Sequence, residues 1–416
     1  MYILISRKRG DTVRTNSLDT QRRAGKPQGF TVVLAGFLPI LAIVSMFPAV
    51  PSIIGHFHAD PTASWKVPWM VTAPGLAIAL VAPFVGILVD RIGRRGLLVW
   101  FTFLYSIIGL APFFLSSLNA LFASRLLLGV CEAVILTVLN TLLGDYWDEE
   151  GRRHWLSIQA AIGPFLASGL ILASGFLTAM QWNGVFLVYL AAFPIFIAMQ
   201  LFIFEPGGDI ASAKGADLQP MSRKFPLGTV TLIGAVTLFS AIVFYVFIVN
   251  GGLAFQELGV RSPSVLGKIT FIPSLFVIVG AGIFWITARA GSAFQLALTL
   301  TLMGLGYVGM GSATSWWWMA AALCLQQIGT GMLVPSLIAW SQKLLPFEHR
   351  GRGMGVWAAA FFLGQFVSPP CVSLVKSALG SMQSAFVATG VLTIIGGLVI
   401  MALLNRGRAP QPAVAG

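Results

Sequence analysis

Residues 86–95 read GILVDRIGRR, and this short polar segment interrupts two long apolar stretches of the chain. Gly86 would let the helix that precedes the turn approach a neighbour closely, because glycine has no side chain. Asp90 would lie at the end of that helix, where it can accept hydrogen bonds from the first turn of another helix. Gly93 permits a tight turn. The spacing therefore indicates a specific structure between two membrane helices.

The same segment carries three arginines, Arg91, Arg94 and Arg95. They would hold the turn on the cytoplasmic side, and they can pair with acids at neighbouring helix ends, such as Asp145 or Glu149. The simpler interpretation is a positively charged cytoplasmic turn without a further role. The ordered pattern of Gly, Asp, Arg, Gly, Arg and Arg within ten residues favours the more specific one.

Long apolar runs and short polar turns alternate along the whole chain. Of its 416 residues, 57% are hydrophobic and 10% are charged, against about 25% charged in soluble domains. This composition excludes a soluble globular enzyme, a disordered protein and a secreted disulfide scaffold. A bilayer core needs about 20 apolar residues per helix. Twelve segments of about that size lie at roughly 29–55, 67–89, 97–117, 119–143, 154–179, 182–204, 226–250, 263–288, 292–313, 316–344, 352–377 and 382–404.

The basic residues predict the orientation of these spans. The net charge is +12, and 21 of the 26 Lys and Arg residues fall on one side if the N-terminus is inside. Cytoplasmic loops are the ones enriched in Lys and Arg. We therefore expect both termini to be cytoplasmic and the protein to lie in the inner (cytoplasmic) membrane of a bacterial-type cell. The segment 1–28 is expected to be a cytoplasmic N-terminal tail, and 405–416 a C-terminal one.

Residues 205–225, EPGGDIASAKGADLQPMSRKF, form the longest hydrophilic stretch in the middle of the chain. They predict a cytoplasmic linker between an N-terminal six-helix half, 29–204, and a C-terminal six-helix half, 226–404. The two halves also show weak sequence similarity in corresponding loops, which read DYWDEEGRRHW and PFEHRGRGMGVW. Repeated halves are typical of transporters with a binding site at the midplane.

The segment 86–95 resembles the loop motif of the major facilitator superfamily, with Gly86, Leu88, Asp90, Arg91, Gly93, Arg94 and Arg95 in register. The resemblance covers the whole chain. It implies an all-α membrane protein with twelve transmembrane helices in two pseudo-symmetric halves. It also implies a cytoplasmic conformational latch that stabilises the outward-facing state, formed by Gly86, Asp90, Arg91, Gly93, Arg94, Arg95 and Asp145. The corresponding loop of the second half keeps only Arg289 and Gly291.

Two charges lie clearly inside a predicted span, Arg125 and Glu132. A charge at mid-bilayer costs about 2.5–3.5 kcal/mol, so each requires an explanation. Seven residues make two helical turns, which places both on nearly the same face. One alternative is a pair that neutralises itself and orients the helix. The other is that Glu132 exchanges a proton while Arg125 tunes it or binds an anionic group.

The surrounding string SRLLLGVCEA resembles the motif of proton-coupled members of the superfamily, with Arg125 and Gly129 matching. Glu132 departs from the motif, which makes it the first choice for the proton-coupling carboxylate. Gly163 and Pro164 predict a kink in the fifth span. They partly match the antiporter motif of the superfamily and so favour export.

Other polar side chains within spans are candidates for the substrate cavity, although helix–helix hydrogen bonding is the more ordinary role of each. They are Gln159, Tyr245, Asn250, Gln326, Gln327 and Gln365.

These observations predict a secondary active transporter, not an enzyme. We expect proton-coupled antiport of a small amphipathic organic compound: a drug, a metabolite or a siderophore-like product. The alternative is a proton symporter or facilitator for uptake of a small organic anion or metabolite. The sequence has no phosphate-binding Gly-Lys-Ser/Thr motif and no metal-binding cluster of His or Cys. We expect no cofactor and no metal, the proton gradient as the energy source, and a monomer in the lipid bilayer without a nucleic-acid partner.

Overall fold

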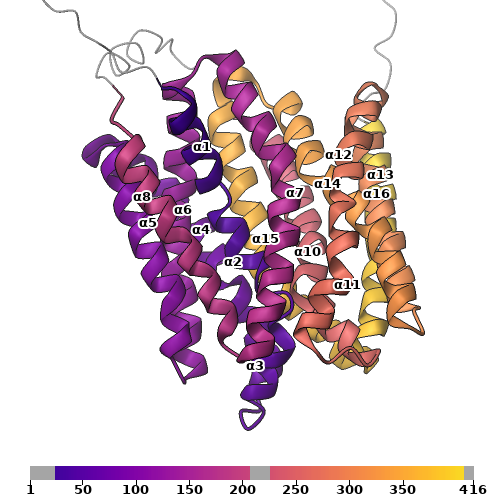
Figure 1. Ribbon diagram of the computed structural model, residues 1–416. Coiled ribbons are helices and arrows are strands. Elements are labelled where there is room, and N and C mark those ends of the chain that lie inside the picture. Colours follow the sequence, from indigo (N-terminus) through magenta and orange to yellow (C-terminus); the bar gives the residue numbers. More distant parts are fainter. Residues whose placement is uncertain (1–23, 207–224, 407–416) are drawn as a thin grey trace, which may run out of the picture.

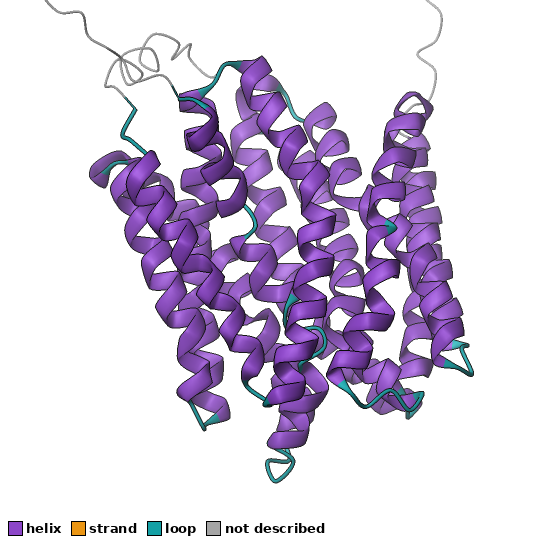
Figure 2. Ribbon diagram, in the orientation of Figure 1, coloured by secondary structure: helices purple, strands orange, loops and turns teal. Residues whose placement is uncertain are grey.

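The computed structural model describes residues 24–206 and 225–406, and every regular element within these two ranges is a helix (Figure 2). The N-terminal half comprises α1 (Lys26–Ala35), α2 (Leu38–Val44), α3 (Val50–His56), α4 (Ala63–Ile92), α5 (Arg94–Leu110), η1 (Ala111–Phe114), α6 (Leu118–Tyr146), α7 (Glu149–Met180), η2 (Gly184–Ala191) and α8 (Ala192–Phe202). The C-terminal half comprises α10 (Leu227–Glu257), α11 (Pro263–Leu275), α12 (Val277–Ile286), η3 (Thr287–Ala290), α13 (Ser292–Gly311), α14 (Trp316–Leu344), η4 (Phe347–His349), α15 (Arg350–Leu379) and α16 (Met382–Arg406).

Twelve helical segments are long and apolar enough to cross a membrane. They stand side by side as one bundle (Figure 1). This arrangement confirms the predicted all-α fold with twelve spans. Most of the predicted tails and linker (1–28, 205–225 and 405–416) lies outside the described residues.

The first span differs from the continuous segment predicted over 29–55, because it is divided into α1, α2 and α3. Pro39 lies in the first turn of α2, and Pro51 lies in the first turn of α3. Proline has no amide hydrogen to continue a helical ladder, so a helix readily begins at these residues. The eighth span is divided in a similar way between α11 and α12, close to Pro273.

Each half has its own buried apolar cluster, and each cluster includes a few residues of the other half. The described chain begins at α1 and ends at α16 on one side of the bundle, the upper side in Figure 1. We call this side the tail side, and we call the opposite side, where α3 lies, the α3 side.

Close contacts join the two halves toward the α3 side. The indole Nε1 of Trp69 on α4 donates to the carbonyl oxygen of Phe366 on α15 at 3.1 Å, and the two rings stack. On the other flank, the hydroxyls of Ser168 on α7 and Ser274 on α11 lie 2.6 Å apart. Gly175 allows this crossing of α7 and α11, because a Cβ there would lie 2.7 Å from a backbone oxygen of α11.

Candidate functional site

A cavity of about 640 Å³ lies between the two halves. Its lining comes from helices of both halves and is mostly apolar. It extends along α7 toward the tail side as far as Leu156, whose side chain is 41% exposed. The cavity therefore opens toward the tail side, while the contacts described above close the bundle toward the α3 side.

Among the described residues that line this cavity, Glu132 is the only charged one. It lies on α6 and is 2% exposed. Its Oε1 is buried without a hydrogen-bonding partner, and no ion pair with Glu132 exists within the described ranges. A buried carboxylate without partners is unfavourable, so this group is available to a proton or a ligand.

Arg125 lies on the same helix but is not part of the cavity lining. Its Nη1 donates to the hydroxyl of Tyr189 in η2, and its guanidinium carbon lies 4.8 Å and 5.0 Å from the ring centroids of Phe186 and Tyr189. The Nε and Nη2 atoms are buried without partners. Arg125 is thus held by aromatic rings within the N-terminal half, and it forms no ion pair with Glu132.

Gly129 lies between these two charges and explains how close α6 comes to α4. A Cβ at this position would lie 2.5 Å from the backbone oxygen of Pro74 on α4. Only glycine permits this approach without movement of the backbone. The close packing places the Glu132 segment of α6 beside the cavity, which Pro74 also lines.

Five of the six predicted cavity candidates line the cavity: Gln159, Tyr245, Gln326, Gln327 and Gln365. Asn250 does not, and its Nδ2 donates to the carbonyl oxygen of Val246 one turn earlier in α10. Gly163 and Pro164 also line the cavity, within a continuous α7. A Cβ at Gly163 would lie 3.1 Å from the ring of Phe37, which lies between α1 and α2.

The predicted latch segment forms the turn between α4 and α5 on the tail side. Gly93 has a φ of +90°, which favours glycine, and it precedes the first turn of α5. Arg94 pairs with Asp145 at 3.2 Å, which confirms the predicted pairing, whereas Glu149 pairs with Arg153 instead. Arg91 is exposed. Gly86 has open space around its Cβ position, and the side chain of Asp90 lies outside the described part of the chain.

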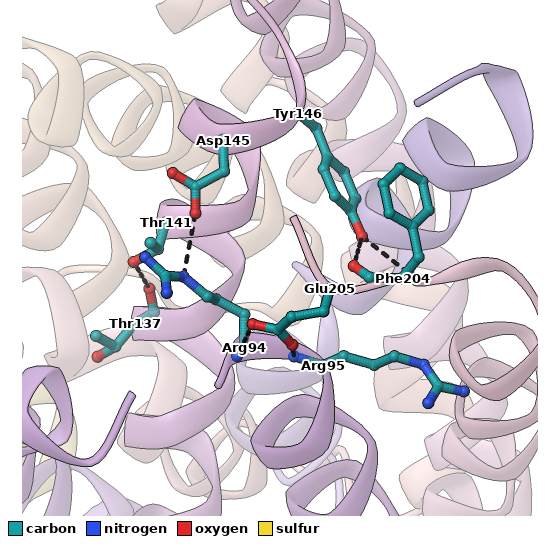
Figure 3. A network of polar contacts seen from close by, with 8 residues as sticks. All are labelled: Arg94, Arg95, Thr137, Thr141, Asp145, Tyr146, Phe204 and Glu205. Carbon is teal, nitrogen blue, oxygen red and sulfur yellow. Dashed lines mark hydrogen bonds and ion pairs between the residues drawn. The ribbon is translucent and has the colours of Figure 1, made fainter. Parts of the chain in front are cut away.

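Glu205, which the sequence analysis did not single out, caps the N-terminus of α5 (Figure 3). Its Oε1 and Oε2 accept from the backbone N–H groups of Arg94 and Arg95, each at 2.7 Å. The Arg95 side chain donates in turn to the backbone oxygens of Ile203 and Gln200. The segment that follows α8, including the first residue of the predicted linker, is therefore fixed to the start of α5.

Tyr146 strengthens the same junction. Its hydroxyl donates to the carbonyl oxygen of Phe204 and accepts from the backbone N–H of that residue at 3.0 Å (Figure 3). We call the group of Arg94, Arg95, Asp145, Tyr146 and Glu205 the tail-side clamp. Glutamate followed by proline directly after an apolar run was the signal in the sequence that could have indicated this capping residue.

Comparison with known proteins gives a consistent family. The model of the Major Facilitator Superfamily matches residues 32–311 and 261–416. The efflux pump dotC of Dothistroma septosporum is 27% identical over 173 residues, which is 40% of this chain and 29% of dotC. The multidrug export protein EmrB of Escherichia coli is 26% identical over 175 residues, which is 41% of this chain and 33% of EmrB. The chain thus aligns with a third or less of the length of these relatives.

Solved structures show the same fold. The inward open conformation of the xylose transporter XylE from E. coli superimposes with a TM-score of 0.73 at 14% identity. The match covers 89% of this chain and 94% of XylE. At this level of identity the similarity shows the architecture of two six-helix halves around a central cavity.

Proposed function

Because the chain belongs to the major facilitator superfamily and is a multi-pass membrane transporter, we propose that it is a proton-coupled antiporter. It exports a small amphipathic organic compound by alternating access of the central cavity to the two sides of the membrane. The substrate class is a drug, a metabolite or a siderophore-like product. The energy comes from the proton gradient, without a cofactor, and the working unit is a monomer.

The observation that carries the proposal is the isolated carboxyl group of Glu132. It is the only charge in the described lining of an apolar cavity, its Oε1 has no hydrogen-bonding partner, and no described residue forms an ion pair with it. A proton that binds to a Glu132 oxygen converts the carboxylate into a neutral acid, which removes the charge from the cavity. Proton binding and substrate binding can then compete for the same group, as antiport requires.

The size and chemistry of the cavity support an amphipathic cargo. A volume of about 640 Å³ lies within the usual range for small-molecule sites, about 300–1,000 Å³. The polar positions, Gln159, Tyr245, Gln327 and Gln365, are spread over both halves within apolar walls. The relatives dotC and EmrB are named for efflux and multidrug export, in agreement with this direction of transport.

The charge pattern supports a cytoplasmic location of both termini, and we assign the protein to the inner membrane. With this orientation, the cavity of the present structure faces the cytoplasm, the side from which an exporter takes its cargo. The tail-side clamp, with Gly86, Asp90, Arg91 and Gly93, then lies at the cytoplasmic surface. We assign these residues to the latch that exchanges partners when the cytoplasmic side closes.

Uptake of an organic anion, with Arg125 as its binding partner, receives no support from the geometry. Arg125 lies outside the described lining, and Tyr189 and Phe186 surround its guanidinium group. We assign Arg125 to a supporting role, in which its positive charge stabilises the ionised form of Glu132 from two turns away on α6.

The test is transport by purified protein in proteoliposomes with an imposed pH gradient and a panel of lipophilic fluorescent dyes. Glu132→Gln keeps the shape of the side chain and removes the titratable group. We expect it to reduce gradient-driven transport at least 100-fold and to leave dye binding without a gradient measurable. Glu149→Gln, at an exposed glutamate on α7, is the matched control and should transport normally. Full gradient-driven transport by Glu132→Gln would refute the assignment.

A further inference from the structure

Gln326 on α14 is a lining residue of the cavity, and the residues behind it fix the orientation of its amide. The side chain is 1% exposed and contributes to the cavity lining. Its Nε2 donates to the hydroxyl of Tyr307 on α13 at 3.3 Å, while its Oε1 is buried without a partner. The amide NH₂ group of Gln326 therefore makes a hydrogen bond, whereas its amide oxygen accepts none.

Tyr307 decides which way this amide points. The Tyr307 hydroxyl donates its single hydrogen to the carbonyl oxygen of Val243 at 2.8 Å, and it accepts from the backbone N–H of Phe247 at 3.1 Å. Both groups belong to one turn of α10, so the hydroxyl is inserted into the backbone ladder of that helix. With its hydrogen already used, it can only accept from Gln326. The Gln326 amide must therefore direct its NH₂ group to Tyr307 and keep its oxygen away from that hydroxyl.

The position of Tyr307 is also fixed by packing. It is fully buried, and its ring contacts Phe386 of α16 edge-on at 5.5 Å. A Cβ at the preceding residue, Gly306, would lie 2.5 Å from the backbone nitrogen of Gln326. The helices α13 and α14 are thus in direct contact where the two side chains meet, and neither can turn without displacing the other.

Two described lining residues thus carry a fully buried acceptor atom without a partner, Glu132 Oε1 in the N-terminal half and Gln326 Oε1 in the C-terminal half. Unpartnered acceptors in an apolar site discriminate strongly, because a ligand without donors leaves them desolvated. We propose that the cavity selects compounds with hydrogen-bond donors on an apolar frame, in particular primary ammonium groups, and that Gln326, oriented by Tyr307, is the acceptor that makes this selection.

This inference rests on the proposed function, since it names the substrate class of the same cavity. Its test uses equilibrium binding to the purified full-length protein, which needs no gradient. The probes are 2-(1-naphthyl)ethylammonium and its N,N,N-trimethyl analogue, measured by titration calorimetry. The two probes carry the same charge and apolar ring, but only the first has N–H donors, so their affinity ratio isolates hydrogen bonding from charge.

We expect the wild type to bind the primary ammonium about tenfold more tightly than the trimethyl analogue, the size of effect that one hydrogen bond to a charged donor gives. Gln326→Met should reduce the ratio to about twofold or less and leave the affinity for the trimethyl analogue unchanged. Gln295→Met is the matched control, because Gln295 is an equally buried glutamine outside the cavity lining. It should retain the wild-type ratio.

Tyr307→Phe tests the positioning role. It leaves Gln326 in place but frees its amide, so the ratio should fall by at least threefold while trimethyl binding, which reports a folded cavity, persists. Equal affinities of the wild type for the two probes, absent binding of both, or an unchanged ratio in Gln326→Met would each overturn the inference. Loss of the Glu132 dependence of gradient-driven transport, with the affinity ratio intact, would instead overturn the proposed antiport alone.

Discussion

Two glutamates, Glu132 in the N-terminal half and Glu205 at the first position of the predicted linker, use their hydrogen-bonding capacity in opposite ways. Both oxygens of Glu205 accept backbone N–H groups at 2.7 Å at the start of α5. Glu132 accepts no hydrogen bond from any residue that the structure describes, although it is 2% exposed. A carboxylate whose oxygens both accept hydrogen bonds can hold two helices together. A carboxylate that accepts no hydrogen bond from the protein can bind a proton or a ligand.

The difference follows from the neighbouring backbone. Helix N-termini present unpaired N–H groups, and a glutamate that reaches one is stabilised by hydrogen bonds and by the helix dipole. Glu257 at the end of α10 repeats this arrangement, since its oxygens accept from Met382 and Gln383 at the start of α16 at 2.8 and 3.0 Å. Glu132 lies in the middle of a long helix, where all backbone donors are already in use.

The largest effect on stability should come from Arg125. Arg125→Leu removes the charge that stabilises Glu132 from a distance, together with the contacts to Tyr189 and Phe186. We expect it to lower the free energy of unfolding by about 3 kcal/mol, because the buried hydrogen bond to Tyr189 and the contacts with two aromatic rings are lost. The double variant Arg125→Leu/Glu132→Gln should be about as stable as Arg125→Leu, because the Glu132 carboxyl can take up a proton when Arg125 is absent. Unfolding of each variant in detergent checks this, and full recovery of stability in the double variant would contradict it.

The next largest effect on stability is expected at Glu205, whose two carboxylate oxygens both accept hydrogen bonds. Glu205→Gln removes the negative charge from the N-terminus of α5 and leaves one of the two N–H groups without an acceptor. We expect a loss of about 1–2 kcal/mol in the free energy of unfolding. Glu149→Gln breaks only the exposed pair with Arg153 and should change stability by less than about 0.5 kcal/mol. Equal effects at both positions would show that the cap does not stabilise α5.

A smaller effect is expected where a single neutral hydrogen bond is lost. The buried hydroxyl of Tyr105 donates to the carbonyl oxygen of Leu38 in α2 at 2.6 Å. Tyr105→Phe should lower the free energy of unfolding by about 1 kcal/mol. Thermal unfolding monitored by tryptophan fluorescence would detect the change, and an unaltered midpoint would indicate that water replaces the hydroxyl.

The smallest effect on stability is expected for Glu132→Gln, and it tests the contrast between Glu132 and Glu205. Glu132→Gln has no hydrogen bond to lose, so we expect the free energy of unfolding to fall by less than about 0.5 kcal/mol or to rise. The same chemical change would thus abolish transport at Glu132 and weaken the fold at Glu205. A marked destabilisation by Glu132→Gln would mean that this carboxyl has a structural partner, and the comparison would fail.

Hydropathy predicted the twelve spans because crossing a bilayer requires a minimum apolar length, which is a local property of the sequence. The division of the first span was missed, although Pro39, Pro48 and Pro51 were visible within the predicted segment 29–55. Prolines occur inside intact helices elsewhere in this chain, as in α4 with Pro68, Pro74 and Pro83. Composition alone therefore does not distinguish a kinked helix from a broken one.

The site was predictable only in part. Arg125 and Glu132 could be identified from the sequence because few charged residues lie within the predicted spans. That Glu132 lines the cavity while Arg125 contacts Tyr189 could not be predicted, because it depends on which helices pack against each side of α6. Asn250 and Gln326 are both polar residues in spans, and the packing of neighbouring helices decided that only Gln326 lines the cavity. Glu205 was missed because its partners, Arg94 and Arg95, are about 110 residues away in the sequence.

The breaks in the first span leave the cavity wall formed by α2 and the residues after it without a continuous helix. Where α2 ends, short-range bonds such as Met46 N–H to Ile43 oxygen replace the regular ladder, and the Tyr189 hydroxyl lies 3.5 Å from the freed oxygen of Ala42. A segment jointed in this way can bend without breaking a continuous helix. Because α2 and the residues that follow it line the cavity, we expect this wall to adapt to a bound molecule more readily than the longer, continuous helices.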